Sequence, residues 1–74
     1  GKLDASEYIM LRTRLADGLD LRRLSERWGI RLQEGQIRML HACEKAGLCT
    51  LTPDRLTLTP KGMLVQNSIL TEVF

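Results

Sequence analysis

The sequence predicts a small α+β domain, and three features of its 74 residues lead to that class. Apolar residues recur at helical spacing through the first half of the chain. Two short β-prone runs, at 49–52 and 55–58, flank a turn that contains proline. A further apolar-periodic segment then follows Pro60. We therefore expect a single domain over residues 1–74, with three helices, a two-stranded β-hairpin and a closing C-terminal helix.

The first helix is expected to begin after Asp4 and to end at Gly18. Asp4 followed three residues later by Glu7 is typical of a capped helix start. Glycine readily takes the left-handed backbone conformation that ends helices. The apolar residues that recur at helical spacing, and so predict the buried face, are Tyr8, Leu11 and Leu15.

The second helix is expected between Asp20, its N-cap, and Gly29, which stops it. Its predicted buried stripe consists of Leu21, Leu24 and Trp28. Residues 30–32 alternate apolar and basic side chains, a pattern that suits a short extended segment.

The third helix is expected from about Glu34 to Ala46. Gly47 and Leu48 are expected to form a Schellman-type ending. One predicted face carries Ile37, Leu40, Cys43 and Ala46.

The tetrapeptide Thr-Leu-Thr-Pro occurs twice, at 50–53 and at 57–60, and we expect two different roles for it. The first copy is followed by another β-prone run, so Pro53 is expected in the hairpin turn. The second copy precedes the last apolar-periodic segment, so Thr59 is expected to cap a helix that begins at Pro60 and runs to about Val73. Three helices, a hairpin wing and a closing helix form the winged-helix order.

Composition excludes several classes of protein. Hydrophobic residues make up 43% of the chain and charged residues 27%, which is typical of globular rather than disordered proteins. No apolar run approaches the ~20 residues of a membrane span. The two cysteines, Cys43 and Cys49, fit neither a disulfide framework nor a C-x-x-C site. Low cysteine use without an export signal predicts a cytoplasmic location.

A winged helix raises the alternative that the chain is the DNA-binding module of a transcription regulator. Residues 1–33 carry seven basic and five acidic side chains, whereas residues 34–74 carry four of each. The third helix, which would read DNA, is therefore neutral. Because phosphate neutralisation supplies most non-specific affinity for DNA, nucleic acid is not the expected partner.

The basic excess of the first half is concentrated on the second helix and the segment after it. It consists of Arg22, Arg23, Arg27 and Arg31. One interpretation is a docking face for an acidic partner, another domain or an anionic ligand. The alternative is a solvated helix face on which Arg22 and Glu26 form an i,i+4 ion pair that contributes little to stability.

No catalytic or metal-binding motif stands out in the sequence. His41 and Cys43 are two residues apart, and on a helix they point to different faces. No phosphate-binding loop, glycine-rich dinucleotide turn or H-E-x-x-H motif occurs. We therefore expect neither catalysis by this domain alone nor a metal site. For His41, a surface position and a role as haem ligand both remain open.

Three stretches of the chain together resemble a known domain. They are Glu-Tyr-Ile-Met-Leu at 7–11, Arg-Leu-Ala-Asp-Gly-Leu-Asp-Leu at 14–21, and Leu-Thr-Pro-Lys-Gly at 58–62 with the residues that run on to Asn67. From about Leu3 to Phe74, the chain resembles the C-terminal domain of the radical-SAM proteins related to oxygen-independent coproporphyrinogen III oxidase. It is more similar to the haem-chaperone branch than to the true oxidases.

This resemblance implies that the chain is the C-terminal part of a longer protein of porphyrin and haem metabolism, either an oxidoreductase or a haem chaperone. The N-terminal radical-SAM barrel of that protein would bind a [4Fe-4S] cluster and S-adenosylmethionine. Cys43 and Cys49 do not match the C-x₃-C-x₂-C cluster motif, so no cofactor is expected in this part. The domain would pack on the barrel and shape the mouth of its active site, with haem or porphyrin as a further partner.

Arg14 and Asn67 fall on recurrent family positions and are the candidate contacts to an anionic ligand or to the barrel. The guanidinium of Arg14 suits a carboxylate such as a porphyrin propionate. An ion pair of Arg14 with Asp17 or Asp20 is the structural alternative. Asn67 is expected in the middle of the closing helix, where its poor helix propensity suggests a hydrogen-bond partner.

Overall fold

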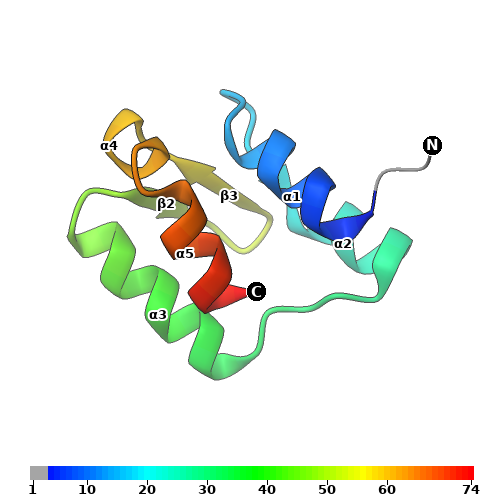
Figure 1. The fold of residues 1–74 in the computed structure, drawn as a ribbon. Coiled ribbons are helices and arrows are strands. Elements are labelled where there is room, and N and C mark those ends of the chain that lie inside the picture. Colours follow the sequence, from blue (N-terminus) through cyan, green and yellow to red (C-terminus); the bar gives the residue numbers. More distant parts are fainter. Residues whose placement is uncertain (1–3) are drawn as a thin grey trace.

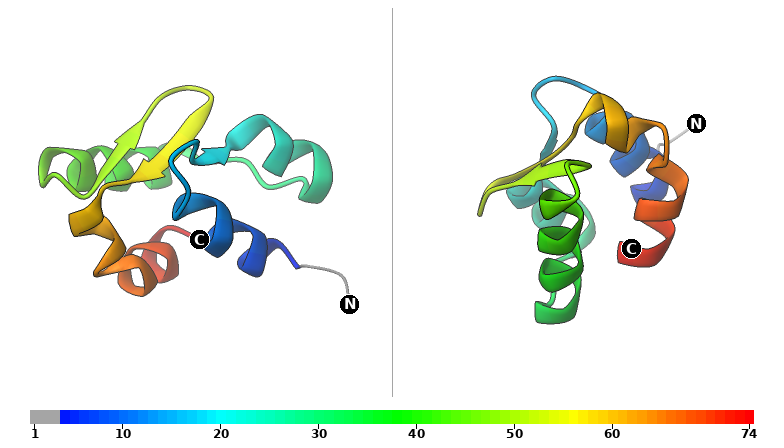
Figure 2. Two further views of the ribbon diagram at one scale, coloured as in Figure 1. Left: turned by 90° about the horizontal axis from the view of Figure 1, so that it is seen from above. Right: turned by 90° about the vertical axis from the view of Figure 1, so that its left-hand side faces the viewer.

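The computed structural model describes residues 4–74, and helices lie in two layers beside a small sheet (Figures 1 and 2). Among these residues the elements in chain order are α1 (Ala5–Thr13), β1 (Leu19–Asp20), α2 (Leu21–Trp28), α3 (Glu34–Lys45), β2 (Cys49–Leu51), β3 (Arg55–Leu58), α4 (Pro60–Met63) and α5 (Gln66–Val73). Figure 2 shows α1 and α5 in one layer and α2 with α3 in the other. The predicted α+β class is confirmed.

The sheet has three antiparallel strands in the order β1-β3-β2. The predicted hairpin forms its larger part, with Cys49 opposite Leu58 and Leu51 opposite Leu56. The strand β1 was not predicted, because two residues carry no periodic signal of their own. It pairs Leu19 with Leu56, and this pairing makes β3 the central strand.

Helix α1 is shorter than expected: it ends at Thr13 rather than at Gly18. Asp4 caps its start as predicted, since its carboxylate accepts a hydrogen bond from the Glu7 N–H at 2.8 Å. The buried side chains are Tyr8, Ile9 and Thr13. Leu11 and Leu15, assigned to the core by their spacing, are 53% and 47% exposed.

The early end of α1 follows from the pairing of β1. The chain must leave the helix to reach the sheet, and Gly18 makes that turn with a φ of 75°. A Cβ atom at Gly18 would overlap the hydroxyl of Thr57 and lie 2.7 Å from the carbonyl oxygen of Leu56. Gly18 is thus required for its conformation and for the close approach to β3.

The predicted boundaries of α2 and α3 are confirmed by their capping contacts. Asp20 accepts hydrogen bonds from the N–H groups of Arg22 and Arg23, at 3.0 and 3.1 Å, and Gly29 follows α2. After α3, the Leu48 N–H donates to the Cys43 carbonyl at 3.0 Å, which is the predicted Schellman bond. Residues 29–33, expected to include an extended segment, form an irregular connection.

The closing helix is not continuous, which corrects the predicted span from Pro60 to Val73. Thr59 caps α4 as expected, because its hydroxyl accepts from the Gly62 N–H at 3.1 Å. The chain then turns at 64–65 before α5 begins. The break lets the buried side chain of Gln66 reach α1, where it donates to the carbonyl oxygen of Met10 at 2.8 Å. If the helix continued straight from Pro60, the chain would not turn toward α1 before Gln66.

The core lies between the two layers. Its buried apolar residues are Tyr8, Ile9, Leu19, Leu24, Leu40, Cys49, Leu56, Leu58, Ile69 and Val73. Among residues 4–74, no helix has both the length and the apolar character needed to cross a membrane.

Candidate functional site

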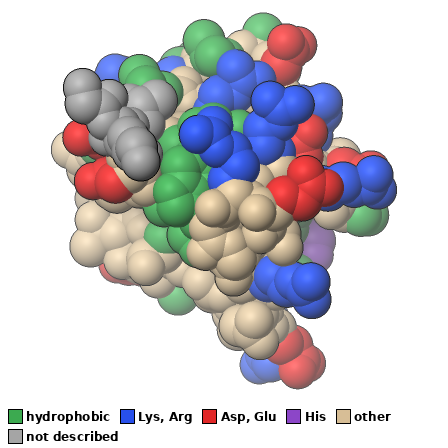
Figure 3. All heavy atoms as spheres, turned by 90° about the vertical axis from the view of Figure 1, so that its right-hand side faces the viewer, with side chains coloured by type: hydrophobic (Ala, Val, Ile, Leu, Met, Phe, Trp, Pro, Cys, Tyr) green, Lys and Arg blue, Asp and Glu red, His purple; other side chains and the backbone are tan. Residues whose placement is uncertain are grey.

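Three arginines project from the exposed side of α2. Arg22, Arg23 and Arg27 are all exposed, and none forms an ion pair within residues 4–74. The pair between Arg22 and Glu26 that their spacing allows is therefore not formed. Figure 3 looks at the side of the molecule on which α2 lies, and Lys and Arg side chains gather there. This side offers several free positive charges.

The carboxylate of Asp20 fixes the start of this basic helix. Its pKa is lowered, chiefly because the Arg23 N–H donates a hydrogen bond to it and also through the Arg22 N–H and the positive charges of Arg55 and Arg23, against a smaller opposing effect of burial. Arg55 is itself placed by donating to the Asp17 carbonyl at 3.0 Å. A charged cap at the positive end of α2 holds the helix in place and thereby orients its arginines.

Arg27 differs from the other arginines because its guanidinium lies over two aromatic rings. Its guanidinium carbon lies 4.6 Å from the centroid of Trp28 and 5.7 Å from that of Tyr8. The two rings contact each other, with centroids 4.7 Å apart and planes tilted by 44°. Trp28 is the only tryptophan and Tyr8 the only tyrosine of the chain. This stack connects α2 to α1 and was not predicted from the sequence.

A groove of about 740 Å³ lies beside α2. It is bounded by α2, the 29–33 connection, α3 and the turn of the hairpin, and its floor is apolar. Its lining comprises Leu21, Arg22, Leu24, Ser25, Glu26, Ile30, Arg31, Leu32, Ile37, His41, Leu51, Thr52, Pro53 and Asp54. Arg31 is held at the rim by a 3.2 Å bond from its Nε to the hydroxyl of Ser25.

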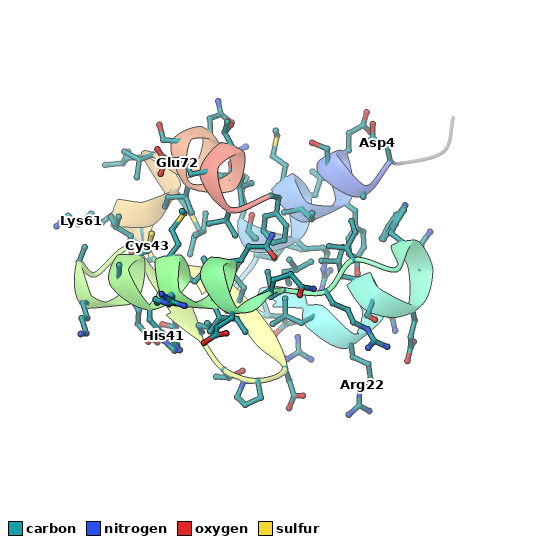
Figure 4. The ribbon with its side chains drawn as sticks, turned by 90° about the horizontal axis from the view of Figure 1, so that it is seen from below. Asp4, Arg22, His41, Cys43, Lys61 and Glu72 are labelled. Atoms are coloured by element: carbon teal, nitrogen blue, oxygen red, sulfur yellow. The ribbon has the colours of Figure 1, made fainter. Side chains whose placement is uncertain are left out.

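His41 lies at this groove and is linked to the sheet through Glu44. Its Nδ1 is 3.3 Å from one carboxylate oxygen of Glu44, while the other oxygen accepts from the Leu51 N–H at 3.0 Å. These contacts lower the pKa of Glu44, the bond from Leu51 most strongly. Figure 4 shows His41 and Cys43 on different sides of α3, so the two do not face one another.

The two cysteines lie in different environments. Burial raises the pKa of the Cys49 thiol to about 11, with smaller contributions from Cys43 and Glu44, and this thiol donates to the Leu40 carbonyl at 3.4 Å. Cys43 is half-buried and lines a small groove of about 220 Å³ between α3 and α5. Metal binding needs the thiolate, so Cys49 is unsuited to be a ligand. Within residues 4–74 no group of three or more His, Cys, Asp or Glu side chains is placed to hold a metal ion.

This difference predicts selective alkylation. At pH 8 only about one thousandth of the Cys49 thiol is ionised at a pKa of about 11. We expect iodoacetamide to modify Cys43 well before Cys49, with peptide mass spectrometry as the measurement. Equal rates at both cysteines would show that the Cys49 site is open to solvent.

The family is decided by a match that covers most of the chain. A family model described as the HemN C-terminal domain matches residues 3–65. The chain belongs to the HemN C-terminal domain family. No curated protein and no solved structure matches it significantly. Membership of the HemN C-terminal domain family implies association with an N-terminal HemN-like domain in the parent protein.

The match ends between α4 and α5, short of the resemblance to Phe74 seen in the sequence. Arg14, Gly18 and Gly62 lie inside the part of the HemN C-terminal domain that is matched, and Asn67 lies outside it. Asn67 is exposed and occupies the first turn of α5, not the middle of a helix as expected. Its poor helix propensity thus costs little and requires no buried partner.

Arg14 is exposed at the C-terminal cap of α1, and within residues 4–74 it forms no ion pair with Asp17 or Asp20. The segments that carry Arg14 and Asn67 lie close together, because the residues next to them, Thr13 and Gln66, are in contact. The amide of Gln66 donates to the hydroxyl of Thr13 at 2.9 Å, so the start of α5 adjoins the end of α1. This buried Gln66 was missed, because one polar residue in an apolar-periodic segment does not reveal a partner 53 residues away.

Proposed function

We propose that this HemN C-terminal domain is a non-catalytic accessory domain. In this proposal it packs on the N-terminal domain of its parent protein and shapes the mouth of that domain's active site. The observation that carries the proposal is the family match over residues 3–65. The family also supports a context of haem metabolism, and within it the sequence resemblance favours a haem chaperone over an oxidase.

Exposed apolar side chains around one junction support packing against a second domain. Leu64, between α4 and α5, is 86% exposed, and Leu11 and Leu15 at the end of α1 are about half exposed. Gln66 ties these two segments together through its bond to Met10. Interfaces between domains of one chain bury apolar surface of this kind. We propose that the N-terminal domain covers this junction, next to Arg14 and Asn67.

The [4Fe-4S] cluster and S-adenosylmethionine implied by the resemblance are assigned to the N-terminal domain, proposed to be a radical-SAM barrel. The residues of this chain do not fit the cluster. A cluster ligand must be a thiolate, whereas Cys49 is a buried thiol with a raised pKa and Cys43 stands alone at its own groove. The chemistry of the parent protein therefore requires residues outside this domain.

Substitution of Leu64 tests the proposal. In the parent protein, Leu64→Asp should speed proteolytic release of this domain roughly tenfold, because a charge would be buried in the interface. Leu64→Met keeps the apolar contact and should leave the rate unchanged. Equal rates for the Asp variant and the unmodified protein would contradict packing at this junction.

The groove beside α2 supports a second candidate, which is direct binding of haem. Its floor is apolar, Arg22 and Arg31 could pair with propionates, and His41 could ligate the iron. Titration with haemin should then give a shifted Soret band that His41→Ala removes and Cys43→Ala, on the other side of α3, preserves. A titration in which His41→Ala behaves like the unmodified domain would exclude this site.

A further inference from the structure

We infer that Arg27, stacked on Trp28 and Tyr8, anchors this domain to a carboxylate on an acidic surface of the parent's N-terminal domain. This inference rests on the proposed function and specifies a face of the domain and a chemistry for the partner. The face comprises Arg23 and Arg27 of α2 with the aromatic pair beneath them. It is separate from the apolar junction around Leu64.

The placement of the Arg27 side chain favours a carboxylate as its partner. A guanidinium that lies over aromatic rings is restricted in its orientations, and the rings cover its face rather than its N–H donors. No atom within residues 4–74 accepts a hydrogen bond from the Arg27 side chain, which leaves its donors available. Because the stack has already restricted the rotamers of Arg27, binding a carboxylate would cost little further entropy. A planar fork of donors matches a carboxylate in two-point contact.

The charges on α2 favour an acidic surface as the partner. Arg22, Arg23 and Arg27 lie along the exposed side of α2, where Glu26 is the only acidic residue, and none of the three arginines is paired within the described chain. By contrast, Arg38 on α3 already pairs with Glu34 at 3.6 Å. The α2 face is thus complementary to an acidic surface, and α3 is not. Arginine, tryptophan and tyrosine are also the residues that most often dominate interface energetics.

The position of this face near the start of α1 favours the N-terminal domain as the partner. Tyr8 lies one turn after Asp4, the first residue that the structure describes, so the stack is beside the start of α1. Figure 1 shows the start of α1 at the same end of the molecule as α2. In a HemN-like parent the N-terminal domain joins this domain through the start of α1. A partner attached there is held at a high effective concentration near α2.

Hydrogen exchange in the parent protein and in the 74-residue chain tests the inference. We expect the backbone amides of α2 and the indole N–H of Trp28 to exchange more slowly in the parent. Arg27→Glu should remove this protection, with an increase in exchange rate on the order of tenfold. Arg27→Lys keeps the charge but loses the fork, so it should give an intermediate loss. Arg38→Glu, the matched charge reversal on α3, should leave the protection of α2 unchanged.

The outcomes separate this inference from the proposed function. If α2 exchanges equally in both proteins while the junction around Leu64 is protected, the docking face is wrong and the packing proposal stands. If neither region is protected, both fail. Equal effects of Arg27→Glu and Arg38→Glu would show that only net charge matters, and would overturn the role of the stack. The melting temperature of the isolated Arg27→Glu chain should lie less than about 8 °C below that of the unmodified chain, because only the contact of Arg27 with the two rings is lost. If the loss is larger, Arg23→Glu is the replacement variant.

Discussion

Replacing Gly62 by alanine is expected to destabilise the domain by about 3 kcal/mol or more. A Cβ atom at this position would overlap the carbonyl oxygen of Leu48 and lie 2.8 Å from its carbonyl carbon. Those atoms belong to the backbone, so no side-chain rotation can relieve the overlap. The Leu48 carbonyl is also fixed by the Thr59 N–H, which donates to it at 3.0 Å. Urea unfolding followed by circular dichroism measures the loss.

Gly35 supplies the matched control for this substitution. It lies in the first turn of α3, and a Cβ there would meet no atom within 4 Å. Gly35→Ala should leave the domain as stable as before, or more stable by up to about 1 kcal/mol, because alanine has the higher helix propensity. If Gly62→Ala unfolds at the same urea concentration as Gly35→Ala, α4 does not pack on Leu48 as described.

Substitutions of one buried and one exposed leucine should distinguish a residue that stabilises the fold from a residue that contacts the N-terminal domain. Leu56 on the central strand is fully buried, whereas Leu64 is 86% exposed. Leu56→Ala should cost about 2–5 kcal/mol of unfolding free energy, since it leaves a cavity between the layers. Leu64→Ala should change the stability of the isolated chain by less than about 0.5 kcal/mol. Thermal and urea unfolding of the two variants measure the contrast.

A large loss for Leu64→Ala in the isolated chain would place that side chain in the core and remove it from the proposed interface. A small loss for Leu56→Ala would contradict the position of β3 at the centre of the sheet. In the parent protein, the difference between the stability losses caused by Leu56→Ala and Leu64→Ala should be smaller, because Leu64→Ala is expected to weaken packing between the domains.

The sequence predicted well those features whose signals are local. Asp20 and Thr59 cap their helices through N–H groups two or three residues away. The two copies of Thr-Leu-Thr-Pro were told apart by the residues that follow each. Features with distant partners were missed: β1 exists only because Leu19 pairs with Leu56, and the break before α5 serves the contact of Gln66 with Thr13. The distant partners, Leu56 and Thr13, leave no periodic pattern in the sequence near Leu19 and Gln66.

In the candidate site, too, features with local signals were predicted and contacts between distant residues were missed. The charges on α2 were evident in the sequence, but their grouping was not: Arg22 and Arg31 line the groove, while Arg27 stacks toward α1. Helical spacing separated His41 from Cys43, and Figure 4 shows them on different sides of α3. The stack includes Tyr8. Helical spacing predicted that Tyr8 is buried, but it did not indicate that its ring contacts the ring of Trp28 on another helix. The family was recognised from short stretches of residues 7–67, and all of them except the end that runs on to Asn67 lie inside the matched range.

The most direct test of the central proposal is how this domain tumbles within its parent protein. Nitrogen-15 relaxation of amides in α1, α2 and α3 reports the rotational correlation time of the domain. If the domain packs on the N-terminal domain, these amides should share the slow correlation time of the whole protein. A correlation time close to that of the isolated 74-residue chain would show two domains moving independently and would contradict the proposed accessory role.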